Sequence, residues 1–193
     1  MRTTKVRRFS FLPKIALALG AVLLVCASAN AATIHGATDA DVLWVSAPKA
    51  APKPVEGVLT NRNRSFIPPL TVIPVGSTIR FPNEDPFFHS IYSTSPQDPF
   101  DIGFYDNGPG KTVPFPNPGI IDVHCHIHAS MHATIIVVDG PYAQSSNGAY
   151  TLTDVPAGKY LLHAWDLAHG DRTMTVDVPT ESADLTLDIR ISR

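Results

Sequence analysis

The amino-acid sequence predicts an all-β fold, and three observations lead to that prediction. Short runs of Val, Ile, Thr and Phe are separated by Pro and Gly, of which the chain has 18 and 12. Several of these runs alternate apolar and polar residues, with the period of two that is typical of a half-buried strand. No useful stretch of helical periodicity follows the first 31 residues, so the Pro and Gly residues separate strands rather than helices.

The first 31 residues predict a secretory signal peptide and not a part of the fold. Basic residues lie between positions 2 and 14, residues 15–25 are apolar, and Ala29-Asn30-Ala31 fits the cleavage pattern of small residues. The apolar run is too short for a membrane-spanning helix. We therefore expect a periplasmic or otherwise extracytoplasmic protein with no membrane span after signal removal. Arg7-Arg8 leaves twin-arginine export open beside the general secretory route.

Removal of residues 1–31 changes both the charge and the cysteine content. The remaining chain carries ten Lys and Arg against seventeen Asp and Glu, a net charge of about −7 with neutral His. This balance argues against nucleic acid as a partner and would suit a basic protein partner. Cys125 is then the only cysteine, so its thiol is buried and inert, paired with another chain, or bound to something else.

Three segments between residues 55 and 142 carry the clearest strand patterns. In residues 77–81 and 120–125, apolar side chains alternate with polar ones. The alternation places the thiol of Cys125 on the inward face of its strand. Residues 135–138 are apolar throughout, which predicts a strand that is buried on both faces.

The segments around this region predict further strands and linkers. Residues 150–154 and 159–165 are expected to be strands joined in a hairpin-like arrangement by the turn at 155–158. Residues 185–191 alternate cleanly, which predicts one more half-buried strand. The linker at 48–54 is rich in Pro, Ala and Lys and is expected to be extended and exposed.

Turn-forming residues between 139 and 150 predict a domain boundary. The expected organisation has four parts: a signal peptide at 1–31, an N-terminal strand and linker at 32–54, a main domain at 55–142, and a C-terminal β-module at 143–193 that residues 33–46 would complete.

The segment from His124 to His132 predicts a metal site. Cys125, His128 and Met131 are each separated by two residues at the end of a predicted strand, so a tight loop would bring the imidazole and thioether back over the thiol. His89, at the edge of another predicted strand, is the candidate for a fourth ligand. Two imidazoles and a thiolate, with a weaker thioether, suit both oxidation states of copper. We therefore expect one copper ion at His89, Cys125, His128 and Met131.

Simpler interpretations compete with this prediction. A lone Cys in a strand is usually a core thiol, but here two His, one Met and the export signal agree with the copper interpretation. His124, His126 and His132 would be either a second, exposed metal patch or solvated surface residues, and the second interpretation is favoured. His163 and His169 are expected to be structural residues. His35 would belong to an amino-terminal copper chelate if cleavage follows Ala32. The residues expected in the core are Trp44, Trp165, Phe81, Phe87 and Phe88.

Residues 85–93, 100–105 and 119–131, with the Val-Val-Asp-Gly-Pro-Tyr that ends at Tyr142, resemble the plastocyanin- and amicyanin-like, methylamine-utilisation-type branch of the cupredoxins. The resemblance covers roughly residues 55 to 142. It implies a Greek-key β-sandwich with His89 and His128 as imidazole ligands, Cys125 as the thiolate and Met131 as the axial ligand. Family members commonly carry Asn after the first ligand His and use it to bridge to the ligand loop, where this chain has Ser90.

Residues 34–39 and 42–45, taken with 150–165, resemble the two ends of a carboxypeptidase-regulatory-like or transthyretin-like β-module. This second resemblance implies a small β-sandwich-like module into which the cupredoxin domain is inserted.

Two functions fit these features. The first is an exported mononuclear copper protein that mediates one-electron transfer between Cu(I) and Cu(II), acts as a monomer and serves a redox protein partner. The alternative is a periplasmic copper carrier or buffer without redox duty. A multicopper oxidase would need further His pairs, which do not occur outside the ligand segment, so an enzyme is not expected.

Overall fold

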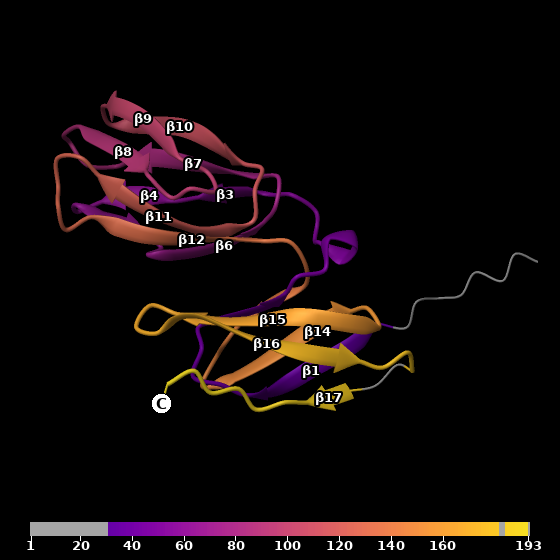
Figure 1. The fold of residues 1–193 in the computed structure, drawn as a ribbon. Helices are drawn as coiled ribbons and strands as arrows, with labels where there is room; N and C mark the ends of the chain where they lie inside the picture. The colour runs from indigo at the N-terminus through magenta and orange to yellow at the C-terminus, as the bar shows by residue number, and fades with distance from the viewer. Residues whose placement is uncertain (1–30, 182–183, 193) are drawn as a thin grey trace, which may run out of the picture.

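The computed structural model describes residues 31–181 and 184–192, and the fold of these residues is an all-β fold, as predicted (Figure 1). The predicted signal peptide falls almost entirely on residues 1–30, which are outside the described residues. Four sheets form two units, one above the other in Figure 1. Within the described ranges, no helix has the length and apolar character needed to cross a membrane.

The upper unit is a sandwich of two sheets. The first sheet has the strand order β10-β7-β4-β5, with β3 also paired to β7. The second sheet has the order β6-β12-β11-β8-β9. The strands of this unit are β3 (Glu56–Val58), β4 (Thr60–Arg62), β5 (Ser65–Ile67), β6 (Leu70–Pro74), β7 (Ser77–Asn83), β8 (His89–Ser93), β9 (Phe100–Tyr105), β10 (Gly108–Phe115), β11 (Gly119–Cys125) and β12 (His132–Val138).

The core of the upper unit lies between its two sheets. In β7, the predicted alternation is observed, because Ile79 and Phe81 are fully buried while Arg80 is only partly buried. In β11, every second residue up to Cys125 is buried, so the thiol points into the sandwich as predicted.

The lower unit is built from both ends of the chain. One of its sheets has the order β14-β1-β17 and the other the order β13-β2-β15-β16. The chain passes from β2 through a short 3-10 turn, η1 (Pro48–Ala50), into the upper unit and returns after β12. The strands of the lower unit are β1 (Ala32–Ala37), β2 (Val42–Val45), β13 (Tyr142–Gln144), β14 (Ala149–Val155), β15 (Gly158–Asp166), β16 (Gly170–Val178) and β17 (Asp184–Thr186).

The prediction of a hairpin between residues 150 and 165 was wrong. Both strands exist, but β14 pairs with β1 in one sheet and β15 pairs with β2 and β16 in the other. The turn at 155–158 therefore crosses from one sheet to the other. Alternation predicts that a strand is half-buried, but it does not determine the strand's partner, and β15 instead forms a hairpin with β16.

Three further expectations need correction. The predicted strand at 185–191 is regular only over β17, after which the chain follows β1 through two hydrogen bonds, from Leu187 N–H to His35 O and from Ile189 N–H to Ala37 O. The linker begins with η1 instead of an extended segment, because Pro48 suits the first position of a helical turn. Phe88 was expected in the core but is 54% exposed.

A cluster of apolar side chains joins the two units. Ile136 and Val138 point out of the upper sandwich and pack with Val42, Trp44 and Trp165 of the lower unit. Ile135 and Val137, on the other face of β12, belong to the upper core. The second unit thus explains why the prediction of a strand buried on both faces was correct. Full burial of each such side chain contributes roughly 1.5–3 kcal/mol, so the contact stabilises both units.

Asp39 fastens the C-terminal segment to the lower unit. Its carboxylate accepts hydrogen bonds from the hydroxyl of Ser192 and from the N–H groups of Ile191 and Ser192, at 2.8 Å from Ile191 N. The Ser192 hydroxyl and the Ile191 N–H, opposed by slight burial, lower the pKa of Asp39 to about 2. An unfolded Asp has a pKa of about 3.9. The stabilisation is therefore complete above that pH and is lost as the pH falls towards 2.

We expect Asp39→Asn to release residues 187–192 at neutral pH, and acidification below pH 2 to have the same effect in the unaltered protein. The methyl resonances of Ile189 and Ile191 in NMR spectra would report the release. Asp41→Asn is the matched control, because the exposed side chain of Asp41 makes no hydrogen bond to another described residue. Unchanged Ile191 resonances in Asp39→Asn would contradict this prediction.

Candidate metal site

The pairing of β8 with β11 places the first two site residues. Cys125 lies opposite Ile91 in this ladder, and the His126 N–H donates to Ser90 O at 2.9 Å. His89 is the first residue of β8 and is fully buried, and Cys125 is 5% exposed. The main chain of Ser90 thus links the strand of His89 to the ligand loop, in the region where the family resemblance implies an Asn side chain.

The loop between β11 and β12 supplies the third site residue. It turns back tightly, because the Met131 N–H donates to His128 O at 2.9 Å. This turn brings the partly exposed His128 over the buried sulfur of Cys125. Met131 is 1% exposed and packs in the core of the upper unit.

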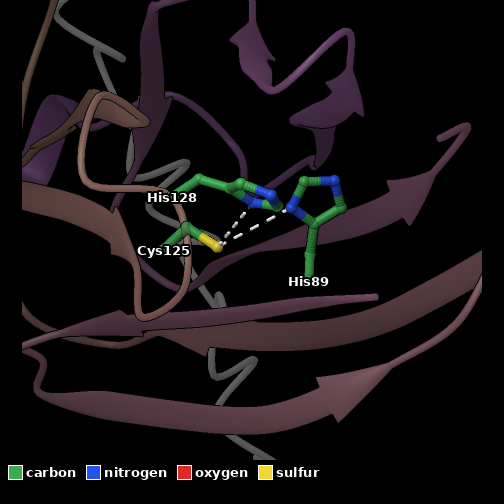
Figure 2. A group of neighbouring side chains, drawn as sticks. All are labelled: His89, Cys125 and His128. Carbon is green, nitrogen blue, oxygen red and sulfur yellow. Dashed lines mark hydrogen bonds between the residues drawn. The ribbon is translucent and has the colours of Figure 1, made fainter. Parts of the chain in front are cut away.

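Figure 2 shows that the side chains of His89, Cys125 and His128 converge. The Sγ atom of Cys125 lies 3.7 Å from Nδ1 of His89 and 3.7 Å from Nδ1 of His128. One ligand atom from each residue falls within 4.8 Å of the others, and no other group of three or more His, Cys, Asp or Glu in the described residues does so. The structure therefore brings three of the four predicted residues to one point.

These separations fit a metal ion. An ion at about 2.3 Å from sulfur and about 2.0 Å from nitrogen, with angles of roughly 110–120°, requires a sulfur–nitrogen separation of roughly 3.5–3.7 Å. The distances alone do not distinguish zinc from copper. The donor set does, because two imidazoles and one thiolate, with a weak axial ligand, hold mononuclear electron-transfer copper, whereas structural zinc sites carry four strong ligands. The residues present thus fit one copper ion.

Asp85 holds His89 from the side opposite the sulfur. Nε2 of His89 lies 2.9 Å from Oδ2 of Asp85, and both side chains are buried. An Nε2–H that donates to this carboxylate leaves the Nδ1 lone pair directed at Cys125. A carboxylate behind a ligand His fixes its ring orientation and makes it a stronger donor.

Asp85 is itself fixed by the turn between β4 and β5. Its two oxygens accept hydrogen bonds from the N–H groups of Asn63, at 2.6 Å, and Arg64, at 3.0 Å. Both residues have a φ of 54°, the left-handed conformation that two-residue hairpin turns require. Burial raises the pKa of Asp85, but the hydrogen bonds from Arg64, His89 and Asn63 outweigh it, and the net pKa lies below the usual value. Asp85 is therefore ionised beside His89.

Phe87 and Arg64 form the wall of the site above the imidazoles. The ring of Phe87 lies 5.4 Å from that of His89 and 5.5 Å from that of His128, and the guanidinium of Arg64 lies 5.0 Å from the Phe87 ring. Burial lowers the pKa of His128, and repulsion from His89 and Arg64 lowers it further against the attraction of Asp85. His128 is therefore neutral at pH 7, as a metal ligand must be.

The other histidines of the ligand segment lie on the outer face of the second sheet. His126 stacks on Tyr92 at 3.9 Å between ring centroids, and its Nε2 lies 3.1 Å from a carboxylate oxygen of Asp101. His124 and His132 face each other across β11 and β12. Elsewhere, His35 lies in β1 with Nε2 3.2 Å from the hydroxyl of Thr186.

Asp85, Arg64 and Phe87 are functional residues that the sequence analysis missed or assigned otherwise. Asp85 precedes His89 by four residues, a spacing that brings side chains together in a helix, and the sequence predicts no helix there. The irregular segment before β8 nevertheless brings the two side chains to 2.9 Å. The approach of Arg64 depends on a turn more than twenty residues away. A carboxylate close before a predicted ligand His was the one available signal.

Comparisons with known proteins gave similarity at the level of solved structures. No protein-family model matches the chain, and neither does any curated protein. A copper-containing nitrite reductase from Thermus scotoductus SA-01 is 31% identical over 45% of this chain, with a TM-score of 0.40, and the match spans 22% of that enzyme. An amicyanin variant in the reduced state is 18% identical over 42% of this chain and 81% of its own length, with a TM-score of 0.40. A second amicyanin variant, in a reduced Cu(I) form at pH 4, is 15% identical over 49% of this chain and 97% of its own length, again with a TM-score of 0.40.

We expect Asp85→Asn to weaken copper binding by about 10- to 100-fold, because the amide removes the charge that orients His89 and strengthens it as a donor. Competition of the protein with a copper chelator would measure the affinity. Glu84→Gln is the control, since Glu84 is a neighbouring carboxylate that pairs with Arg62 on the surface. Equal affinities of the two variants would show that the charge of Asp85 is not needed.

Proposed function

We propose that this chain is an extracytoplasmic, monomeric protein of the cupredoxin family that transfers one electron at a time. His89, Cys125 and His128 would hold one copper ion, with Met131 as a weak axial ligand. The observation that carries the proposal is the pair of equal 3.7 Å separations from one buried sulfur to two imidazole nitrogens. Bound copper would supply the one-electron couple.

The contacts around these residues support rapid electron transfer. His89 is fixed by a buried carboxylate, Cys125 by the β8–β11 ladder and His128 by the turn to Met131. Side chains held this firmly move little when the charge at the site changes. Little movement means a small reorganisation energy, which a one-electron carrier requires.

The surface near His128 supports docking of a redox partner. Ile127 precedes His128 in the ligand loop, and Phe88 precedes His89. Their side chains are 45% and 54% exposed. Phe104, which is 65% exposed, lies opposite Ser90 in the β8–β9 ladder. We propose that the electron leaves through the exposed edge of His128, across these apolar side chains, to a protein whose basic groups complement the acidic charge of this chain.

The proposed protein has a signal peptide and two domains. We propose export by the signal peptide at 1–31, a cupredoxin domain at 55–142, and a carboxypeptidase-regulatory-like module in which residues 143–193 are joined by strands from 33–46. The pairing of β1 with β14 and β17, and of β2 with β13 and β15, supports this division.

A copper carrier or buffer is the second candidate function. The observation that favours it is the position of His124 directly opposite His132, because cross-strand neighbours of this kind have Cβ atoms roughly 4.5–5.5 Å apart and their imidazoles can share one ion. More than one tightly bound copper per chain would favour the carrier, whereas a single copper with rapid electron exchange would favour the electron-transfer protein.

The copper-loaded protein is expected to show an intense visible absorption from charge transfer between the Cys125 thiolate and Cu(II). Cys125→Ser should abolish this absorption, because the alcohol is not ionised at neutral pH. His132→Ala, which removes an exposed imidazole on the outer face, should leave the absorption intact. A colourless protein with one Cu(II) per chain would refute the proposed coordination.

Met131→Leu tests the axial ligand. Leucine nearly conserves the volume of the buried side chain but removes the thioether, so folding and visible colour should persist. The reduction potential should rise, because the axial donor is one of the groups that tune it. Voltammetry of the two proteins would measure the shift. An unchanged potential would indicate that Met131 is a core residue only.

A further inference from the structure

A second group of reactive side chains lies away from the copper site, where the two units meet. A hollow of about 300 Å³ is lined by Trp44, Ser46, His163 and Asp171 of the lower unit, and residues of the upper unit that include Asp139 form its other wall. From the sequence alone, His163 is expected to be a structural residue. Its position in the wall of a hollow, between a hydroxyl and a carboxylate, calls for a different interpretation.

Ser46, His163 and Asp171 form a continuous hydrogen-bonded chain. The Ser46 Oγ atom lies 3.3 Å from Nε2 of His163, and Nδ1 of the same ring lies 2.8 Å from Oδ2 of Asp171. The Nδ1–H donates to the carboxylate, which leaves the Nε2 lone pair to accept the serine proton. This is the order of nucleophile, general base and orienting carboxylate that activates serine for covalent catalysis.

The three side chains are fixed by regular structure. Trp44 and His163 are opposite each other in the β2–β15 ladder, and their rings stack at 4.4 Å between centroids with an interplanar angle of 6°. The Ser46 N–H donates to Leu161 O at 3.0 Å. Asp171 is the second residue of the return strand β16, and its buried Oδ1 has no hydrogen-bond partner among the described residues. Stacking therefore holds the imidazole in one plane. The carboxylate beside it makes a hydrogen bond to this ring and to no other described residue.

Ser46 also borders a second hollow. This one has a volume of about 460 Å³, and its walls are mainly apolar, with Ala47, Pro48, Pro156 and Tyr160 among them. Ser46 thus contributes to the walls of both hollows, and its hydroxyl is directed at His163.

We propose that Ser46 is a nucleophile that cleaves small carboxylic esters with an apolar acyl group. Its Oγ bonds to the carbonyl carbon while His163 Nε2 takes the serine proton, and His163 returns that proton to the departing alkoxide as the ester C–O bond breaks. Water then attacks the acyl-serine, gives its proton to His163 and releases the carboxylic acid, and His163 reprotonates Ser46. Asp171 is a positioning residue that keeps the imidazole in the required tautomer.

This site is separate from the copper site. Gly119 and Val137, which line the 300 Å³ hollow, lie at the ends of β11 and β12 far from Cys125. Gly119 lies six positions before Cys125 along the extended strand β11, a distance of about 20 Å. The esterase activity should therefore be the same in the unaltered protein and in Cys125→Ser, and a failure of either proposal leaves the other testable.

A fluorophosphonate probe, which phosphonylates activated serines, tests the proposal on the full mature protein. Intact mass and peptide mapping should show one adduct per chain, on Ser46. His163→Gln should slow labelling by about 100-fold or more, because it removes the general base. Ser145 is a partly buried serine of the same unit without a His partner among the described residues. The Ser145→Ala variant should therefore be labelled at the rate of the unaltered protein. Hydrolysis of p-nitrophenyl butyrate should exceed that of the acetate, since the longer acyl group fills the apolar hollow.

The role of Asp171 has its own measurement. The Nδ1 proton of His163 should give a downfield NMR resonance that is lost in Asp171→Asn, together with a fall in the labelling rate. An absence of labelling in the unaltered protein, or labelling at any residue other than Ser46, would overturn the proposal. The hydrogen-bonded chain would then serve only to join the strands of the lower unit.

Discussion

The pairing of β8 with β11 is the constraint on which the proposed copper site depends. It fixes Cys125 beside Ile91 and ties the ligand loop to Ser90 through one main-chain hydrogen bond. The side-chain period of a strand is two, so a shift of one residue in this register would turn the thiol outward. Such a shift would also expose Ile121 and Val123, which are fully buried. The hydrophobic core of the upper unit therefore protects the geometry of the metal ligands.

The second constraint is the carboxylate behind His89. A charge buried without partners would cost several kcal/mol, and Asp85 avoids this cost through two main-chain N–H donors and the imidazole. Its position couples the β4–β5 turn to the metal site, although the two are far apart in the sequence. The same turn carries Arg64, whose positive charge helps to lower the pKa of His128 and so favours the neutral form of that ring. The surroundings of His128 thus favour the neutral form that metal binding needs.

The sequence predicted local features well and long-range ones poorly. The period of two and the Cys–His–Met spacing depend on neighbouring residues, so the inward thiol and the convergence of His128 on it could be inferred. The strand partners of β14 and β15 depend on a choice between sheets that alternation does not encode. The exposure of Phe88 could not be inferred either, because hydrophobicity predicts burial only on average. Ser46, His163 and Asp171 lie on three separate segments, and only the paired β2, β15 and β16 bring them together.

The double burial of β12 links these observations. One face of this strand belongs to the core that also contains Cys125, and the other face packs on Trp44 and Trp165. Trp44 in turn stacks on His163, so the strand that supports the metal loop at one end contributes to the wall of the Ser46 hollow at the other. A rearrangement of the two units would have to expose the apolar side chains of this contact to water. The hydrophobic contact that joins the units therefore keeps both reactive sites in place, although no ligand is shared between them.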